Sequence, residues 1–224
     1  MIAPVACVIP ARDAERTVRA VAEGVRESVP HVMLVGVDDG SRDGTRAALH
    51  AVCDVVIGFD QNRGKGAALR AGIYAALARD AAAVITIDAD GQHDPAAAAT
   101  LLAALREADL AIGTRERNGS AMPFGRRLTN ALASAAVGRI IGTPVPDPQS
   151  GYRAMRRAVC ERVRATGDRY EYETEFLIAA GRAGFRIAAV PVRTSYGAPS
   201  HFRAVRDSAR VVRAIWRERA GGKR

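Results

Sequence analysis

Short, continuous hydrophobic runs alternate with longer segments of helical spacing along the first half of this chain. The runs lie at residues 5–9, 32–37, 55–57, 83–87 and 110–112. Between them, apolar residues recur three and four positions apart, as Val18, Val21 and Val25 do, which predicts helices. Strands that are hydrophobic throughout are buried on both faces. The alternation therefore predicts an α/β fold with a mostly parallel sheet flanked by helices.

Helices are expected at residues 14–28, after a turn at 41–43, at 64–79 and from residue 95 onward. The second half of the chain is less regular. Its expected elements are a helix over 124–141, a loop over 142–150, a strand over 151–157, a helix over 173–183 and a strand over 187–192. The length of 224 residues and the lack of a low-complexity linker predict one domain over residues 1–224.

The positive charge of the chain is concentrated at its end. Net charge is +9, and residues 201–224 contain eight Lys or Arg against Asp207 and Glu218. This balance predicts a polyanionic partner, either a nucleic acid or an anionic membrane surface. Residues 202–219 also carry an apolar stripe flanked by arginines, which is typical of a basic amphipathic helix on a bilayer. The alternative is a terminal helix packed on the domain with its arginines in water.

The cysteines and the hydrophobic segments limit where the protein can work. Cys7, Cys53 and Cys160 are far apart and have no metal-ligand spacing, which indicates a reducing compartment and no disulfide framework. The first residues do not read as a signal peptide, and no run approaches the ~20 apolar residues of a spanning helix. We expect a soluble or peripheral protein.

An acidic step follows the fourth predicted strand. Asp88, Asp90 and Gln92 alternate in sequence, so on an extended backbone their side chains would face the same side. Two carboxylates and an amide oxygen suit Mg²⁺ or Mn²⁺ and leave positions open for phosphate oxygens. The alternative is an acidic turn, because Asp90-Gly91 is ordinary turn punctuation.

Two further polar clusters follow strand ends and are expected at the same edge of the sheet. Asp38 and Asp39 could accept hydrogen bonds from a nucleotide base, or could belong to a plain strand-to-helix turn. Lys65, between two glycines at a helix start, could meet phosphate, or could be a solvated lysine. Acids at 171–175 read as a charged helix start, although one of them could reach this edge.

The motifs, in their order, resemble glycosyltransferase family 2, and within it the dolichol-phosphate mannose synthase-like group. The likeness covers residues 5 to 203, nearly the whole chain. Its pieces are Val8-Ile9-Pro10, Asp38-Asp39-Gly40-Ser41, Gly64-Lys65-Gly66, Asp88-Ala89-Asp90-Gly91-Gln92-His93, Gly113-Thr114-Arg115, Asp147-Pro148-Gln149-Ser150-Gly151-Tyr152-Arg153, Glu173 with Glu175, Val190-Pro191-Val192, and Tyr196-Gly197 with Ser200. The resemblance implies a GT-A fold. Residues 1–115 would then bind the nucleotide sugar, residues 116–200 the acceptor, and residues 201–224 would form the basic helix.

The resemblance also implies roles for individual residues. Asp88, Asp90 and Gln92 correspond to the metal and diphosphate site, with Asp90 also among the catalytic residues. Further nucleotide-sugar contacts are implied at Pro10, Arg12, Asp13, Asp38, Asp39, Lys65, Asp88 and Ala89. Arg115 and Arg126 correspond to the pair that holds an acceptor phosphate. Asn130 and Ser150 complete the implied acceptor site.

The chain departs from the family pattern at three places. The usual aromatic-Asn-Glu after Pro10 is replaced by Arg12-Asp13-Ala14, which alters the base and ribose contacts. Asn130 stands where a small hydroxyl is usual. The late Ser-Lys pair is Ser200-His201, so His201 or Arg203 is expected to take over a diphosphate contact.

These expectations combine into an inverting glycosyltransferase that uses Mg²⁺ or Mn²⁺. It would move a hexosyl group, such as mannose from GDP-mannose, or a sugar from a UDP-sugar, to a polyprenyl phosphate. It would act in the cytoplasm, peripherally on the inner face of the cell membrane, and its oligomeric state is left open. One alternative is a soluble saccharide or small-metabolite acceptor, for which an acid near Glu173 or Glu175 would be the base. Another is a basic nucleic-acid-binding protein, which lacks a recognition signature here.

Overall fold

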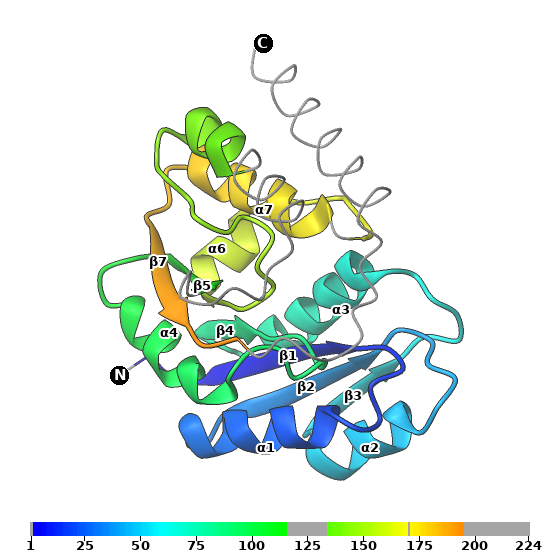
Figure 1. Cartoon of the computed structure of the whole chain (residues 1–224). Coiled ribbons are helices and arrows are strands. Elements are labelled where there is room, and N and C mark those ends of the chain that lie inside the picture. The colour runs from blue at the N-terminus through cyan, green and yellow to red at the C-terminus, as the bar shows by residue number, and fades with distance from the viewer. Residues whose placement is uncertain (1, 116–133, 170, 195–224) are drawn as a thin grey trace.

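The structure is a computed structural model, and it describes residues 2–115, 134–169 and 171–194. Seven strands form one sheet. They are β1 (Val5–Ala11), β2 (Met33–Asp38), β3 (Val55–Gly58), β4 (Ala83–Thr86), β5 (Leu110–Arg115), β6 (Arg153–Arg156) and β7 (Ile187–Val192). Their order across the sheet is β3-β2-β1-β4-β6-β5-β7 (Figure 1).

The sheet is parallel except for one strand. β1 pairs in parallel with β2 and β4, β2 with β3, and β5 with β7. β6 runs antiparallel to both of its neighbours, β4 and β5. The start of β6 therefore lies at the edge of the sheet where all the other strands end. The predicted mostly parallel sheet is confirmed.

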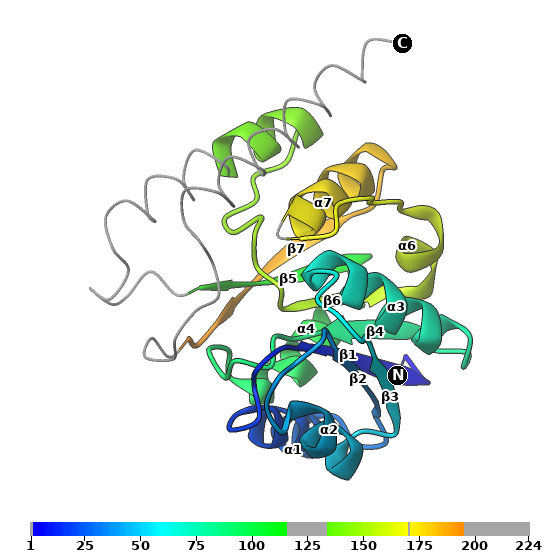
Figure 2. The same ribbon diagram turned by 90° about the vertical axis from the view of Figure 1, so that its right-hand side faces the viewer.

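Helices cover both faces of the sheet, as the continuous hydrophobic strands predicted (Figures 1 and 2). On one face, α1 (Val18–Ser28), α2 (Thr45–Val52) and α4 (Ala98–Ala104) pack on alternate residues of β1 such as Cys7 and Ile9. On the other face, α3 (Lys65–Leu77), α6 (Arg157–Arg162) and α7 (Glu171–Arg182) form a second core with Ala6 and Val8, in which α3 packs on β1, α6 on β4 and β6, and α7 on α3. Residues 134–141 are also helical, and Val137 joins this second core.

A glycine lets α3 lie close to the sheet. A Cβ atom at Gly72 would fall well inside 3.0 Å of Val8 Cγ1, nearer than real Cβ atoms come to other atoms. Glycine destabilises the interior of a helix. Gly72 therefore lowers the intrinsic stability of α3 but allows the helix to pack closely on β1. The close approach also fixes the start of α3 over the edge where the strands end.

Several element boundaries differ from the sequence expectations. α1 begins at Val18 and not at residue 14, because residues 14–17 form a turn in which the Thr17 and Val18 amides both donate to the Ala14 carbonyl. The helix expected from residue 95 starts as a short 3-10 turn, η1 (Pro95–Ala97). The strand expected over 151–157 is β6, after which α6 begins directly, a helix that was not predicted.

Other expectations fall partly or wholly outside the described residues. The helix predicted over 124–141 is described only from residue 134, and the basic helix predicted over 202–219 is not described. Within the described ranges, none of the helices has the length and apolar character needed to cross a bilayer. Cys7, Cys53 and Cys160 are all free thiols, as expected.

Candidate donor-binding and catalytic site

The polar clusters predicted at strand ends meet at one edge of the sheet, which we call the C-terminal edge. β1 ends at Ala11, β2 at Asp38 and β4 at Thr86, and parallel pairing places these ends together. β6 enters at the same edge, where the Thr86 hydroxyl donates to the Gly151 carbonyl at 2.7 Å. The carboxyl edge of such sheets is where ligands bind.

The Lys65 ammonium group lies between two carboxylates from different elements at this edge. Its Nζ is 2.7 Å from Asp88 Oδ1, 2.9 Å from Asp88 Oδ2 and 2.7 Å from Glu173 Oε1. Lys65 opens α3, Asp88 follows β4, and Glu173 lies in the first turn of α7. Burial alone would lower the pKa of Lys65, but the two carboxylates outweigh it and the pKa is raised. Lys65 is therefore a permanent cation here.

Gly151 forms the wall behind this ion pair. A Cβ atom at Gly151 would lie 2.6 Å from Nζ of Lys65 and 2.8 Å from Oδ2 of Asp88. Any larger residue must displace the tips of both side chains. The glycine of the Gln149-Ser150-Gly151 motif thus leaves room for a charge pair at the strand edge.

Arg153, also buried, fixes the loop that leads into β6. Its guanidinium donates to the carbonyl oxygens of Ser150 and Pro148, both at 2.9 Å. Burial lowers the pKa of Arg153, and the nearby Glu173 carboxylate opposes that shift. Ser150, predicted in the acceptor site, is itself buried, and its hydroxyl accepts from the Tyr152 amide at 3.3 Å.

The acidic step after β4 is a turn and not an extended segment. Gly91 has a φ of 71°, and the Asp90 carboxylate accepts from the Gln92 amide at 3.0 Å. The alternation of Asp88, Asp90 and Gln92 on extended backbone is therefore wrong, because a positive φ at the glycine bends the chain between them. The turn is tied to α1 by the Thr17 hydroxyl, which donates to the Ala89 carbonyl at 2.6 Å.

The turn still offers the donor set of a hard cation. Asp88 and Asp90 are both partly exposed at the C-terminal edge, and their oxygens, with the Gln92 amide oxygen, are the ligand types that Mg²⁺ and Mn²⁺ prefer. Over the ranges that the structure describes, no three Asp, Glu, His or Cys side chains form a metal-binding group. A metal here would therefore rely on two carboxylates and a neutral oxygen, and would compete with Lys65 for Asp88.

Asp39 holds the loop that enters α3. Its carboxylate accepts from the Asn62 side chain at 2.8 Å, from the Arg63 amide at 2.7 Å and from the Gly64 amide at 3.0 Å. Burial raises the pKa of Asp39, and the hydrogen bonds from the Arg63 and Gly64 amides oppose the rise. Asp39 thus places the start of α3 and, through it, Lys65.

Asp38 has a comparable structural task on the other side of β2. Its carboxylate accepts from the Arg46 guanidinium at 2.7 Å and from the Ser41 amide at 3.0 Å. Arg46 continues to the Phe59 carbonyl at 2.7 Å. Asp38 therefore joins the ends of β2 and β3 to α2, and it is almost fully buried.

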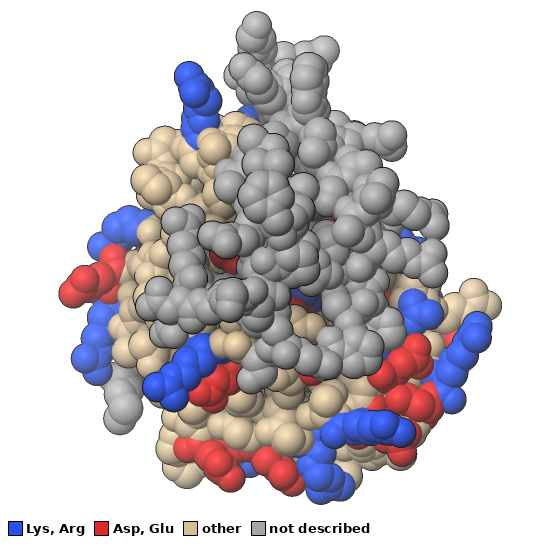
Figure 3. All heavy atoms as spheres, viewed as in Figure 1, with Lys and Arg blue, Asp and Glu red and all other residues tan. Residues whose placement is uncertain are grey.

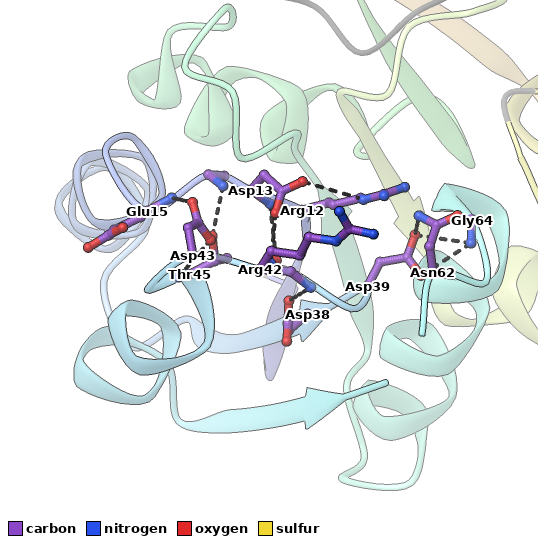
Figure 4. Close-up of polar contacts among 12 residues, drawn as sticks. Arg12, Asp13, Glu15, Asp38, Asp39, Arg42, Asp43, Thr45, Asn62 and Gly64 are labelled. Carbon is purple, nitrogen blue, oxygen red and sulfur yellow. Dashed lines mark hydrogen bonds and ion pairs between the residues drawn. The ribbon is translucent and has the colours of Figure 1, made fainter. Parts of the chain in front are cut away.

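Two loops of the C-terminal edge are joined side by side (Figure 4). The Asp13 carboxylate accepts from the Arg42 amide at 2.8 Å, and the Asp13 amide donates to the Ser41 hydroxyl at 3.0 Å. The Arg12 guanidinium lies 3.6 Å from Asp13 and is partly exposed. The residues that replace the family's usual pattern after Pro10 therefore organise the loop, and Arg12 adds a cation at its surface.

The amides at the start of α3 are already engaged. Gly66 and Ala67 donate to the Asp168 carbonyl, at 2.8 and 3.3 Å. Arg70 holds the same loop through Gly167 and Asp168. The Lys65 side chain, which was predicted to meet phosphate, faces the C-terminal edge. The Gly66 and Ala67 amides do not, because they donate to Asp168.

Comparison with known sequences adds a decisive observation to this geometry. The sequence profile of glycosyl transferase family 2 matches residues 6–164, more than half of the chain. The chain belongs to glycosyltransferase family 2. The resemblance inferred from the ordered motifs is confirmed.

Two relatives of this glycosyltransferase have names that refer to polyprenol or undecaprenyl phosphate and to mannose. Polyprenol monophosphomannose synthase of Mycolicibacterium smegmatis is 31% identical over 198 residues, covering 83% of this chain and 75% of that protein. Undecaprenyl-phosphate mannosyltransferase of Micrococcus luteus is 32% identical over 182 residues, covering 75% of this chain and 74% of that protein.

Solved structures support the fold. Glucosyl-3-phosphoglycerate synthase from Mycobacterium tuberculosis, in complex with Mn²⁺, UDP and glucosyl-3-phosphoglycerate, superposes with a TM-score of 0.77 at 23% identity. The match covers 96% of this chain and 79% of that one. The glycosyltransferase therefore has the predicted GT-A fold.

The structure places most of the predicted donor-site residues at the C-terminal edge, but describes few of the acceptor-site residues. Arg115 ends β5 at this edge, paired in register with Val192, and its side chain is not described. Outside the described residues lie Arg126, Asn130, His201 and Arg203. Pro10, predicted to open the nucleotide loop, is a buried residue of β1.

Three contacts at this edge were not predicted. They are the Lys65–Glu173 ion pair, the Thr17 bond to Ala89 and the Arg153 bonds to its own loop. An acid of the 171–175 segment was expected to reach this edge, but its partner could not be named. Nothing local marks Thr17, because its acceptor lies 72 residues away.

Proposed function

We propose that this glycosyltransferase moves a hexosyl group from a nucleotide sugar to a polyprenyl phosphate, with inversion at the anomeric carbon. The observation that carries the proposal is the Asp88–Asp90 turn beside Lys65 at the C-terminal edge of a GT-A sheet. Two relatives that cover most of the chain are named for sugar transfer to polyprenyl or undecaprenyl phosphate. Their names support the acceptor class.

A phosphate acceptor explains why a strong base is not required. A phosphate monoester is ionised near neutral pH, so one of its oxygens can attack the anomeric carbon directly. In-line attack forms the new bond as the bond to the diphosphate breaks, which inverts the anomeric centre. In this proposal Arg115 and Arg126 orient the acceptor phosphate, and positioning of this kind supplies much of the rate.

The donor diphosphate is assigned to the turn after β4. Asp88, Asp90 and Gln92 would hold Mg²⁺ or Mn²⁺, which neutralises charge that builds up on a departing diphosphate. Lys65 adds a partly buried cation at the same place. Electrostatic stabilisation of the leaving group is the main contribution expected from these side chains.

For the donor we propose GDP-mannose. Both relatives are named for transfer of mannose, which supports the sugar. The base would meet the loops held by Asp38 and Asp39, where Arg12 offers hydrogen-bond donors to a base oxygen. A UDP-sugar is the competing donor, and the assay below compares the two.

We also propose that the enzyme works peripherally on the inner, cytoplasmic face of the cell membrane. Residues 116–133 carry a net charge of +2 and residues 201–224 a net charge of +6, so nearly all of the positive excess lies in these two segments. On the face drawn in Figure 3, basic and acidic side chains of the described residues are interspersed. Two basic segments, one within and one directly after the acceptor half of the sequence, suit an anionic bilayer.

The test is a transfer assay with labelled donors. Purified enzyme is mixed with labelled GDP-mannose, or with labelled UDP-glucose or UDP-N-acetylglucosamine, and with a polyprenyl phosphate and Mn²⁺. We expect label to enter the lipid phase with GDP-mannose. No lipid-soluble product with any of these donors, with or without Mn²⁺, overturns the lipid acceptor.

Membrane association is tested separately. Replacing Arg206, Arg210 and Arg213 with glutamine should reduce sedimentation with phosphatidylglycerol-containing vesicles and leave transfer to a short, water-soluble polyprenyl phosphate intact. Unchanged vesicle binding would contradict the membrane role of this segment.

A hydroxyl-bearing soluble acceptor is the weaker candidate, because it needs a general base. The acids expected to supply that base are engaged in the described structure. Glu173 pairs with Lys65, and Glu175 accepts from the Thr166 and Gly167 amides at 3.1 and 2.8 Å. A nucleic-acid-binding role has no support from the family match.

A further inference from the structure

Glu173 is a buried acid at the donor site with no task in the chemistry proposed above. Only 2% of the residue is exposed, and its Oε1 lies 2.7 Å from Nζ of Lys65. Burying a carboxylate is costly unless a cation compensates it. Lys65 is that cation, and it is shared with Asp88 on the other side.

The charges at this place match a divalent cation. Asp88, Asp90 and Glu173 contribute three negative charges and Lys65 one positive charge, which leaves two net negative charges. Arg153 is a further positive charge close by, but the buried Asp147 carboxylate lies near it and offsets it, so this second pair leaves the balance unchanged. Without Glu173, a cation approaching Asp88 and Asp90 would meet the full repulsion of Lys65.

Contact geometry also distinguishes the two carboxylates around Lys65. Asp88 offers both of its oxygens to Nζ and is partly exposed at the turn, whereas Glu173 is enclosed on α7. If Asp88 turns toward an incoming metal, Lys65 loses one partner and keeps the other. The enclosed carboxylate stays against the ammonium, which compensates its charge in this partly buried place.

We propose that Glu173 is a positioning residue that retains Lys65 at the donor site when Asp88 exchanges its ion pair for a divalent cation. Lys65 then remains beside the turn as a second positive charge for the diphosphate. This inference rests on the proposed donor site, and it assigns Glu173 a role in metal and diphosphate binding in place of proton transfer.

The test measures Mn²⁺ binding without nucleotide, by calorimetry on the full chain. Glu173→Gln removes one negative charge and should weaken Mn²⁺ binding about tenfold, the size expected of one nearby charge in a partly buried site. Lys65→Met should strengthen Mn²⁺ binding by about the same factor. The double variant restores two net negative charges, so its Mn²⁺ affinity should return close to that of the wild type.

Binding of GDP or UDP in the presence of Mn²⁺ tests the positioning itself. With Mn²⁺ saturating for every variant, Glu173→Gln should weaken nucleoside diphosphate binding in the wild-type background and have no further effect in the Lys65→Met background. Glu173→Asp keeps the charge and should keep Mn²⁺ affinity near that of the wild type. Glu161→Gln is the matched control, because Glu161 pairs with Arg157 at the surface of α6 and its loss should change neither affinity.

Three outcomes overturn the inference, and the first is distinguishable from the other two. Wild-type protein that binds neither Mn²⁺ nor a nucleoside diphosphate removes the donor site and Glu173's role with it. If the wild type binds Mn²⁺ and nucleoside diphosphate, and Glu173→Gln lowers only the melting temperature, the donor site stands. Glu173 is then a structural residue. The same conclusion follows if Glu173→Gln still weakens nucleoside diphosphate binding in the Lys65→Met background.

Discussion

At the residue scale, Gly151 offers a direct probe of the ion pair at the donor site. Replacing it with alanine puts a methyl group against the tips of Lys65 and Asp88, which are flexible, so the fold can absorb it. We expect a melting temperature within a few degrees of the wild type, since a stability change of 1 kcal/mol shifts a chain of this size by only about 2–4 °C. Sugar transfer should fall by at least about tenfold, because a small misplacement of charged groups is costly in catalysis.

Steady-state kinetics and thermal unfolding of the Gly151→Ala variant check this prediction together. A variant with wild-type kcat/KM would show that Lys65 and Asp88 need not stay where the structure puts them. A large loss of stability would instead show that the structure around Gly151 cannot adjust to the added methyl group.

Asp43 provides a pH-dependent contribution to stability. Burial is the largest single effect on the pKa of Asp43 and raises it, but the bonds that its carboxylate accepts from the Thr45 hydroxyl and from the Thr45 and Glu15 amides together outweigh burial, and the pKa is lowered. A lowered folded-state pKa stabilises the protein above the ordinary carboxyl value of 3.8, and this stabilisation is lost as pH falls through the lowered pKa.

Asp43→Ala should therefore reduce the free energy of unfolding by about 1 kcal/mol at neutral pH. The gap between the two proteins should narrow as the pH falls from 3.8 through the lowered pKa, because below both values Asp43 is protonated in both states of the wild type. Urea unfolding of both proteins at several pH values measures the gap. A gap that stays constant down to strongly acidic pH would contradict the lowered pKa.

Two residue-level features of the site, the partners of Asp39 and the shape of the acidic turn, could not be predicted from the sequence. Asp39 was predicted to contact a nucleotide base, and in the structure it accepts from residues 62–64. That partner lies more than 20 residues away, and only the folded sheet brings it to the end of β2. Likewise, the composition of the acidic turn was readable, but its shape depends on the positive φ of Gly91.

At the element scale, the contact between α3 and β1 predicts a sensitive position. Gly72→Ala improves helix propensity by about 1 kcal/mol. Its new methyl group, however, runs into Val8, a stiff β-branched side chain in the middle of the sheet. Overpacking of this kind costs roughly 1–3 kcal/mol, so the net effect should be destabilising.

Chemical denaturation of Gly72→Ala checks the sign. Gly24→Ala in α1 is a useful comparison, because its Cβ would sit at 3.0 Å from Pro95 and needs a smaller adjustment. A more stable Gly72→Ala variant would mean that α3 can move off the sheet without cost.

Elements buried on both faces were the ones that the sequence predicted well. β2 and β4 fall within one residue of the expected runs, because strands in such positions are apolar throughout. α6 was missed because six residues are too few to show a helical period. The antiparallel direction of β6 could not be read from its residues, since direction depends on the chain's path and not on local composition.

At the scale of the whole molecule, the proposed site makes a prediction about metal removal. Excess EDTA should suppress sugar transfer, because a diphosphate leaving group would then face the Asp88 and Asp90 carboxylates without a divalent cation between them. Added Mn²⁺ or Mg²⁺ should restore the rate, which a radiolabel assay measures. Full transfer in EDTA would remove the metal from the proposed function and leave the family assignment unaffected.

The antiparallel β6 also orders the assembly of the molecule in time. β5 leaves the ribosome before β6, yet it pairs only with β6 and β7, so its hydrophobic edge stays unpaired until about forty more residues have been made. The pairings of β3, β2, β1 and β4 with one another all lie within the first 86 residues, so this half can form first. We therefore expect the nascent chain to fold in two steps. The β3-β2-β1-β4 half forms first, and β6 then joins β5 and β7 to it and completes the sheet.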